Sequence, residues 1–222
     1  MTHMPLDQQL LNACAALLLL LSFAMLSQRR IVSLVNLLAM QGAALAAATL
    51  LLAWRTGEDH LYVSAALTVA LKVIFLPWLL HRLIRRLAVY WDTEPLLNVS
   101  GTMMAGIVIV VFAFGLAQPI TQLASTSMRN AVGIAIAVVL LAFLMMITRR
   151  KAMSQVVGFL AMENGLFFGA MSATYGMPMV IELGVALDVL VAVLVLGVFF
   201  FQIREQFDSL DLHHLERLSE RR

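Results

Sequence analysis

The sequence predicts an all-α integral membrane protein with seven transmembrane helices. Of its 222 residues, 62% are hydrophobic and 13% are charged, which leaves too little polar surface for a water-soluble globule. Seven apolar stretches each suit the roughly 20 residues that a helix needs to cross a bilayer. They lack the strict apolar and polar alternation of a membrane barrel, so we expect helices, which satisfy their own backbone hydrogen bonds.

The seven predicted helices follow one another along the chain. They cover Leu10–Ser27, Ile31–Ala53, Leu61–Ile84, Val99–Ala117, Ala131–Thr148, Ala152–Ala173 and Met179–Ile203. We expect the first to remain in the protein, because the segment before it has no Lys or Arg and carries Asp7, unlike a signal peptide. The single cysteine, Cys14, excludes a disulfide framework and a thiolate metal cluster, and is interpreted as packing.

The basic residues indicate the orientation of these helices in a bacterial cytoplasmic (inner) membrane. In a seven-helix arrangement, one side receives only Arg55 and Arg129. The other side receives Arg29, Arg30, Arg82, Arg85, Arg86, Arg149, Arg150, Lys151, Arg204, Arg217, Arg221 and Arg222. This bias predicts an outer N-terminus and a cytoplasmic C-terminus. The basic residues lie between the apolar stretches and form no patch that would bind nucleic acid. The lipid bilayer is therefore the expected partner.

A weak internal repeat becomes visible when the second predicted helix is laid over the sixth. The matched segments are VNLLAMQG (35–42) with VGFLAMENG (157–165), and ALTVALKV (66–73) with ELGVALDV (182–189). Gln41 then lies opposite Glu163, and Lys72 lies opposite Asp188. The alternative is a chance alignment of Leu- and Ala-rich segments, which the coincidence of these polar positions makes less attractive.

The repeat divides the chain into two diverged three-helix units with one extra helix between them. The extra helix keeps both units in the same orientation, because three helices alone would invert the second unit. The predicted parts are a first repeat at 1–90, a linking fourth helix at 91–129, a second repeat at 130–203 and a cytoplasmic polar tail at 204–222.

Three ionisable residues, Lys72, Glu163 and Asp188, lie inside predicted membrane helices. A charge at the bilayer centre costs at least about 2.5 to 3.5 kcal/mol, so such residues persist mainly when they are paired, hydrated or functional. At about 1.5 Å per residue, each lies roughly 14 to 16 Å from the outer end of its helix. A common depth is typical of a row of proton-exchanging sites, in which water or a neighbour switches the protonation state. The alternative is a permanent bridge between Lys72 and one carboxylate.

Three further polar residues are weaker candidates for such a relay. Gln41 suits either a water chain or hydrogen bonding between helices. Glu182 lies near the outer start of the last helix, where it is either interfacial or part of an exit path. His81 lies at the cytoplasmic end of the third helix, where its charge would suit the helix dipole or a relay. The sequence contains no motif for a metal, a phosphate or a catalytic nucleophile.

Small residues indicate which face of the sixth predicted helix packs closely. Gly158, Gly165 and Gly169 recur near heptad spacing and include a G-x-x-x-G pattern, which is typical of close helix contact and also common in generic packing. Glu163 lies about 200° around the helix from Gly165. We therefore expect one face to pack and another to present the carboxylate.

Several segments carry a resemblance to a known family. They are RRKAMSQVVGFLAMENGLFFGA, ALKVIFLPWLLHRLIRR, ELGVALDVLVAVL and SLDLHHLERL. Along most of its length the chain resembles component E of hydrogenase-4, a membrane-bound hydrogenase. Its last three predicted helices also resemble the K subunit of bacterial complex I and its counterpart in multisubunit cation/proton antiporters. In that subunit two membrane-embedded glutamates correspond to Glu163 and Asp188, and Asp188 departs from the pattern by one methylene.

The resemblance implies a non-redox subunit of a complex I-like [NiFe] hydrogenase, with no catalytic centre and no cofactor of its own. It places the [NiFe] centre and Fe–S clusters in partner subunits, and implies antiporter-like large subunits, a membrane anchor and a peripheral hydrogenase arm as partners. The buried residues would then serve proton or sodium translocation coupled to electron transfer. The alternatives are a structural adaptor between anchor and antiporter-like subunits, an antiporter subunit, or a free-standing small transporter.

Overall fold

A computed structural model describes residues 6–87, 98–120 and 126–174, together with single residues between 184 and 197. The chain divides into two compact units, Met1–Ala186 and Leu187–Arg222, and the helices α1 to α7 belong to the first. All regular structure in the described ranges is helical, which confirms the predicted all-α class. Six described helices are long and apolar enough to cross a membrane, whereas the sequence predicts seven. Most of the seventh, at Met179–Ile203, lies outside the described residues.

The helices of the first unit follow the predicted order. They are α1 (Leu6–Ser27), α2 (Ile31–Thr56), α3 (Asp59–Thr68), η1 (Val69–Phe75), α4 (Leu76–Leu87), α5 (Val99–Ile120), α6 (Thr126–Thr148) and α7 (Ala152–Thr174). The third predicted helix is one span built from α3, the π-helix η1 and α4, and it is apolar from Asp59 to Arg85. The sequence pattern gives no indication of this change of helix type in the middle of the span.

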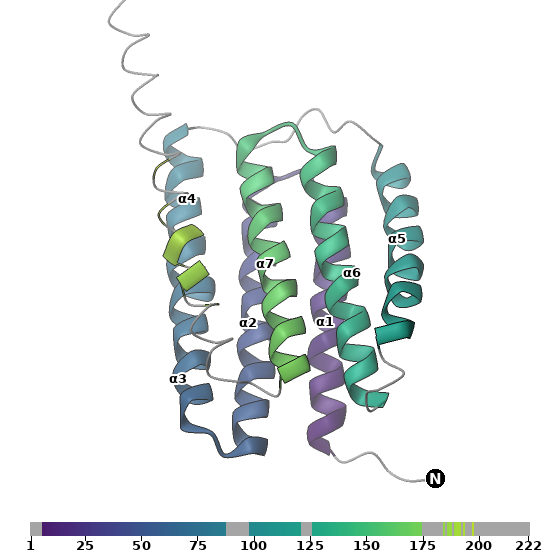
Figure 1. The fold of residues 1–222 in the computed structure, drawn as a ribbon. Coiled ribbons are helices and arrows are strands. Elements are labelled where there is room, and N and C mark those ends of the chain that lie inside the picture. The colour runs from purple at the N-terminus through teal and green to yellow at the C-terminus, as the bar shows by residue number, and fades with distance from the viewer. Residues whose placement is uncertain are drawn as a thin grey trace, which may run out of the picture. The chain divides into compact units, whose positions relative to one another are not determined.

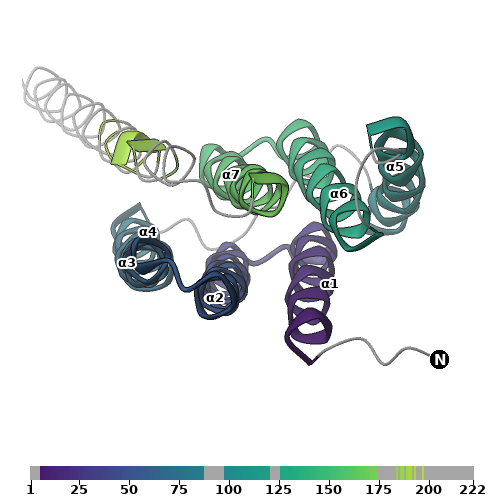
Figure 2. The ribbon, with the colours of Figure 1, turned by 60° about the horizontal axis from the view of Figure 1, so that its bottom comes forward.

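The helices of this unit stand in two rows, as Figure 2 shows. One row holds α1, α2 and the α3–α4 span, and the other holds α5, α6 and α7. The rows meet where α1 contacts α6 and α2 contacts α7. Figure 1 shows these helices lying side by side along their length. The contact between α2 and α7 brings the middle of α7 close to the α3–α4 span.

The α2–α3 turn and the start of α1 lie at one end of the unit, which we call the Gly57 end. Gly57 follows α2 with a φ of 72°, a left-handed conformation that glycine adopts without a steric penalty. Its amide donates to Ala53 O at 2.8 Å and so closes the last turn. At the same end, Arg55 Nε lies 3.2 Å from Asp7 Oδ2, which joins the last turn of α2 to the first turn of α1.

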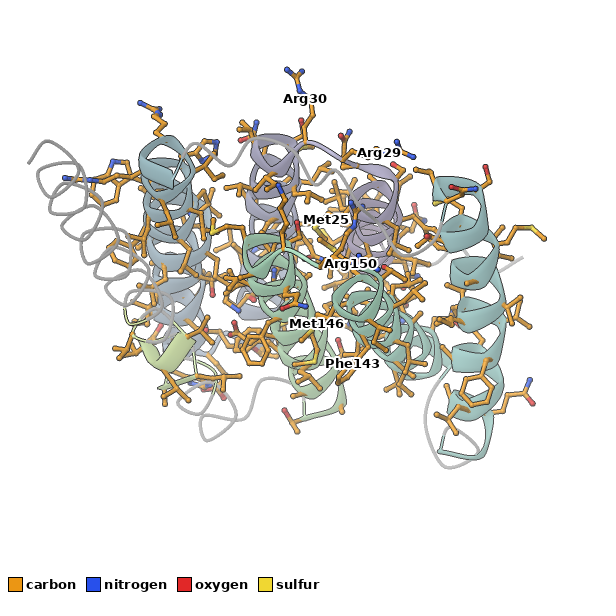
Figure 3. The ribbon with its side chains drawn as sticks, turned by 90° about the horizontal axis from the view of Figure 1, so that it is seen from above. Met25, Arg29, Arg30, Phe143, Met146 and Arg150 are labelled. Carbon is orange, nitrogen blue, oxygen red and sulfur yellow. The ribbon has the colours of Figure 1, made fainter. Side chains whose placement is uncertain are left out.

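A buried arginine organises the opposite end, which we call the Arg149 end. The Arg149 guanidinium donates to the carbonyl oxygens of Leu26 at 3.0 Å and Gln28 at 2.5 Å. Helix C-termini leave such carbonyls without partners inside the helix, so Arg149 caps α1 from the α6–α7 connection. Figure 3, seen from this end, shows Arg29, Arg30 and Arg150 nearby. The two connections at this end are thus joined.

Glycines bring α7 against α6. A methyl group added at Gly165 would lie 2.8 Å from Val138 Cγ1, and one added at Gly169 would lie 2.9 Å from Ala135 Cβ. At Gly158 the neighbour would be the Met146 side chain at 2.7 Å. Larger residues would push the helices apart. This face is distinct from the one that carries Glu163.

Candidate functional site

A buried ion pair joins the α3–α4 span to α7. Lys72 Nζ donates to Glu163 Oε1 at 2.8 Å, and the two side chains are 5% and 1% exposed. Such a pair, held away from water, combines a large desolvation cost with a strong mutual attraction. The structure therefore brings together two of the three ionisable residues that the sequence placed inside the membrane.

Three uncharged side chains extend this pair toward α1. Lys72 Nζ also donates to Asn164 Oδ1 at 2.9 Å, and Asn164 Nδ2 donates to Gln41 Oε1 at 3.1 Å. Gln41 Nε2 then donates to Ser22 Oγ at 2.9 Å, and Ser22 Oγ donates to Leu18 O at 2.9 Å. The result is one polar chain through four helices, with every member buried.

An aromatic ring completes the immediate surroundings of the ammonium group. Lys72 Nζ lies 5.6 Å from the centroid of the Phe167 ring, within the range of a cation–π interaction. Glu163 and Phe167 occupy positions i and i+4 on one face of α7, and Asn164 lies on the adjoining face, so one helix supplies a carboxylate, an amide and a ring. Charge, hydrogen bonding and an apolar cover thus meet at one atom.

The helix around Lys72 is wound as a π-helix, and Pro77 supplies a physical reason. Proline has no amide hydrogen, and in an α-helix its ring clashes with the carbonyl four residues earlier. In η1 the Leu76 amide donates to Leu71 O, five residues earlier, which is the π-helical pattern. Single π turns of this kind occur frequently at functional sites.

Gly42 lets α2 approach this π-helix closely. A methyl group added at Gly42 would lie 3.1 Å from Lys72 Cβ and 3.4 Å from Lys72 O. Gly42 directly follows Gln41, so the close approach and the hydrogen bond to Asn164 occur at the same level of α2. Gln41 and Gly42 therefore position two groups of the site: Gln41 holds the Asn164 side-chain amide, and Gly42 admits the backbone of Lys72.

The chemistry of this site centres on its two ionisable members. Amide and hydroxyl side chains do not take up a proton near neutral pH, so Asn164, Gln41 and Ser22 orient their neighbours and do not carry charge. A proton moving from Lys72 Nζ to Glu163 Oε1 would convert an ion pair into a neutral pair.

The remaining predicted site residues lie elsewhere. His81 belongs to α4, about 13 Å along the span from Lys72 at 1.5 Å per residue. Its Nδ1 lies 2.7 Å from Pro77 O, which can only accept, so this ring nitrogen is the donor and the ring is tied to its own helix. Asp188 and Glu182 lie outside the described residues. No group of three or more His, Cys, Asp or Glu in the described part of the chain could hold a metal ion.

Two members of the polar chain have no counterpart among the predicted site residues. Asn164 directly follows Glu163, and its position beside a buried carboxylate was the signal that could have found it. Ser22 is a single hydroxyl in an apolar helix, and nothing in the sequence distinguishes it from a serine that bonds only to its own backbone. Gln41 was predicted without a partner, and the structure gives it two.

Comparison with known proteins identifies relatives of the whole chain. It is 38% identical over 210 residues to the uncharacterised protein Rv0085 of Mycobacterium tuberculosis. The aligned residues cover 94% of this chain and 96% of that protein. The chain belongs to the family of Rv0085. It is also 22% identical over 209 residues to hydrogenase-4 component E of Escherichia coli K12 and of Shigella flexneri, covering 94% of this chain and 97% of each relative.

No family model and no solved structure matches the chain. The relation to hydrogenase-4 component E is therefore distant in identity but nearly complete in length. Together with the six apolar helices, it indicates a multi-pass membrane protein.

Proposed function

We propose that this chain is a non-redox membrane subunit of a hydrogenase-4-type complex, in which the Lys72–Glu163 pair handles protons. The observation that carries the proposal is the buried pair itself, at 2.8 Å with both side chains almost fully enclosed. The relation to hydrogenase-4 component E supports the assignment to a complex. The [NiFe] and Fe–S chemistry belongs to partner chains in this proposal, and this chain supplies part of a polar path through the membrane.

The pair suits proton handling for an energetic reason. A charge left alone in a membrane interior costs several kcal/mol, so a lysine and a carboxylate in contact stabilise each other as an ion pair or as a neutral pair. The two states differ by one proton moved across a hydrogen bond. A neighbouring subunit that delivers or removes charge during electron transfer would shift this balance. Asp188, on the last predicted helix, is the proposed next site, and sodium is the alternative ion.

Two finer parts of the proposal concern symmetry and orientation. We propose that residues 130–203 correspond to the K subunit of complex I, and that residues 1–90 are a diverged copy in which Gln41 replaces a carboxylate. The hydrogen bond between Asn164 and Gln41 supports this, because it joins equivalent levels of the two copies. The distribution of Lys and Arg supports an outer Gly57 end.

The hydrogen-bond network also favours a second candidate function, that of a structural adaptor. The polar chain ties α1, α2, η1 and α7 together, as a fixed bridge would. In an adaptor the pair would hold helices in place for the anchor and the antiporter-like subunits and would never change its protonation state.

Glu163→Gln in the intact complex separates the two candidates. The complex is first purified in mild detergent, and its partner chains are identified by mass spectrometry. We expect the assembled complex to keep its redox activity but to lose at least tenfold of its redox-driven proton uptake in vesicles, because Gln cannot accept a proton. Glu58→Gln is the matched control, since this carboxylate is exposed and lies at the Gly57 end. Unchanged proton uptake with a reduced yield of complex would establish the adaptor instead.

A further inference from the structure

A second polar feature lies on the α3–α4 span, between Lys72 and the Gly57 end. Ser64 and Thr68 are buried, 2% and 4% exposed, although they belong to a helix that presents Tyr62 and Val63 at its surface. Ser64 and Thr68 are four residues apart on α3 and so share one helix face, and Lys72, which is also buried, follows four residues later in η1. This face leads from the first turns of α3 to the ion pair.

The hydroxyl of Ser64 is the observation that points to a ligand. Among the residues that the structure describes, no hydrogen-bonding partner lies within reach of Ser64 Oγ, and the atom is enclosed. Buried hydroxyls are nearly always satisfied, and an ordered water is the usual partner when no protein group is present. Ser154 Oγ is enclosed in the same way but lies on α7, nine residues from Glu163 and about 180° around the helix.

The spacing of Ser64 and Thr68 on α3 fits a single bridging water molecule. Positions four residues apart rise about 6 Å along an α-helix. Two O–H···O hydrogen bonds in series reach about 5.5 Å, so one water spans the step from Ser64 to Thr68. Thr68 Oγ1 donates to Ser64 O at 2.9 Å and keeps its lone pairs for accepting from a water. Ser64 and Thr68 thus offer two hydroxyl oxygens on one face of α3 that a water can join.

We propose that the face of α3 carrying Ser64 and Thr68 holds a water path that connects the Lys72–Glu163 pair with the aqueous phase at the Gly57 end. The ligand is water, and the path conducts protons between that phase and the pair. The conduction of protons along this path rests on the proposed function. The presence of water beside Ser64 and Thr68 does not. It assigns Ser64 and Thr68 as positioning residues that bind water without changing their own charge.

The path is tested by the access of a small thiol reagent in the assembled complex. The background is Cys14→Ala, which removes the single cysteine of the chain. Ser64→Cys and Thr68→Cys are exposed to Ag⁺, an ion small enough for a water path, from the Gly57 side of membrane vesicles. After denaturation and separation of the subunits, the remaining thiol of this chain is counted with a maleimide. Ala53→Cys is the matched control, because Ala53 is fully buried and lies closer to the end of its helix than Ser64 does.

We expect both path cysteines to react at least tenfold faster than the Ala53→Cys thiol. Adding Ser64→Leu should slow the reaction at Thr68→Cys to the rate of the control, because leucine blocks the path. Equal rates at Ser64→Cys and Ala53→Cys, or no effect of Ser64→Leu on Thr68→Cys, would overturn the path. The readout reports water access alone. Fast labelling with unaffected ion movement in Glu163→Gln would therefore refute the proposed function and leave the path in place.

Discussion

Single residues determine how this protein tolerates charge within a membrane. Lys72 and Glu163 are each too costly to bury alone, and together they form one enclosed contact. Asn164 adds a second acceptor for the ammonium and fixes its direction. By contrast, Arg55 and Asp7 meet at an exposed end of the bundle, where water screens the interaction and the pair contributes little.

This contrast predicts unequal effects of removing one partner. We expect Lys72→Met to lower the free energy of unfolding by about 3 to 5 kcal/mol, because it leaves the Glu163 carboxylate enclosed without its cation. The double variant Lys72→Met/Glu163→Met should recover most of that loss. Arg55→Met is the control and should cost at most about 1 kcal/mol. Denaturant unfolding of the purified protein in detergent measures all three, and an equal cost for Lys72→Met and Arg55→Met would contradict the account.

At this scale the sequence predicted the charged residues better than their neighbours. Lys72 and Glu163 stand out because a charge in an apolar stretch is rare, and their pairing was one of two alternatives. Asn164 and Ser22 did not stand out, because amides and hydroxyls are less costly in a membrane helix and have many local partners. Which of them face one another depends on helix rotation, which spacing along one helix does not determine.

At the scale of the helices, close packing and the π-helix together place the lysine. Pro77 interrupts the α-helical hydrogen bonds, η1 shifts the register around Lys72, and Gly42 admits the resulting backbone against α2. On α7, glycines face α6 while the Glu163 face meets the α3–α4 span. Each helix therefore separates a packing surface from a polar surface.

The role of Gly42 predicts a local steric effect. We expect Gly42→Leu to destabilise the protein by about 1 to 3 kcal/mol, because the side chain would collide with Lys72 and force α2 and η1 apart. Gly115→Leu is the matched control on α5, since nothing lies within 4 Å of a methyl group added there. Thermal unfolding in detergent distinguishes them. Similar melting temperatures for both variants would show that η1 does not depend on this contact.

The presence and order of the helices were largely predictable from the sequence. The start of α1 and the π-helical segment were not. Apolar length alone located all six described spans, because a bilayer imposes that length. The predicted start at Leu10 was late, since α1 begins at Leu6 and carries Asp7 in its first turn, where it meets Arg55. The π-helix was missed because hydropathy does not register which carbonyl an amide bonds to.

At the scale of the whole first unit, helices that the predicted repeat would make equivalent lie beside each other. The α1 helix contacts α6, and α2 contacts α7, as Figure 2 shows. The repeat, the orientation and the seventh helix stay predictions. Exposed aromatic residues suit a membrane-spanning direction, with Trp54 and Tyr62 near the Gly57 end and Trp78 toward the other. The exposed apolar side chains of α5 suit contact with lipid.

The central claim is that Glu163 changes its protonation state while the complex works. Infrared difference spectroscopy of the purified complex, recorded between resting and turnover states, observes that change directly as a carboxylic-acid carbonyl band. We expect such a band in the native complex and its loss in Glu163→Gln, with no loss in the Glu58→Gln control. Identical difference spectra in the native and Glu163→Gln complexes would contradict the claim and leave the pair as a fixed bridge.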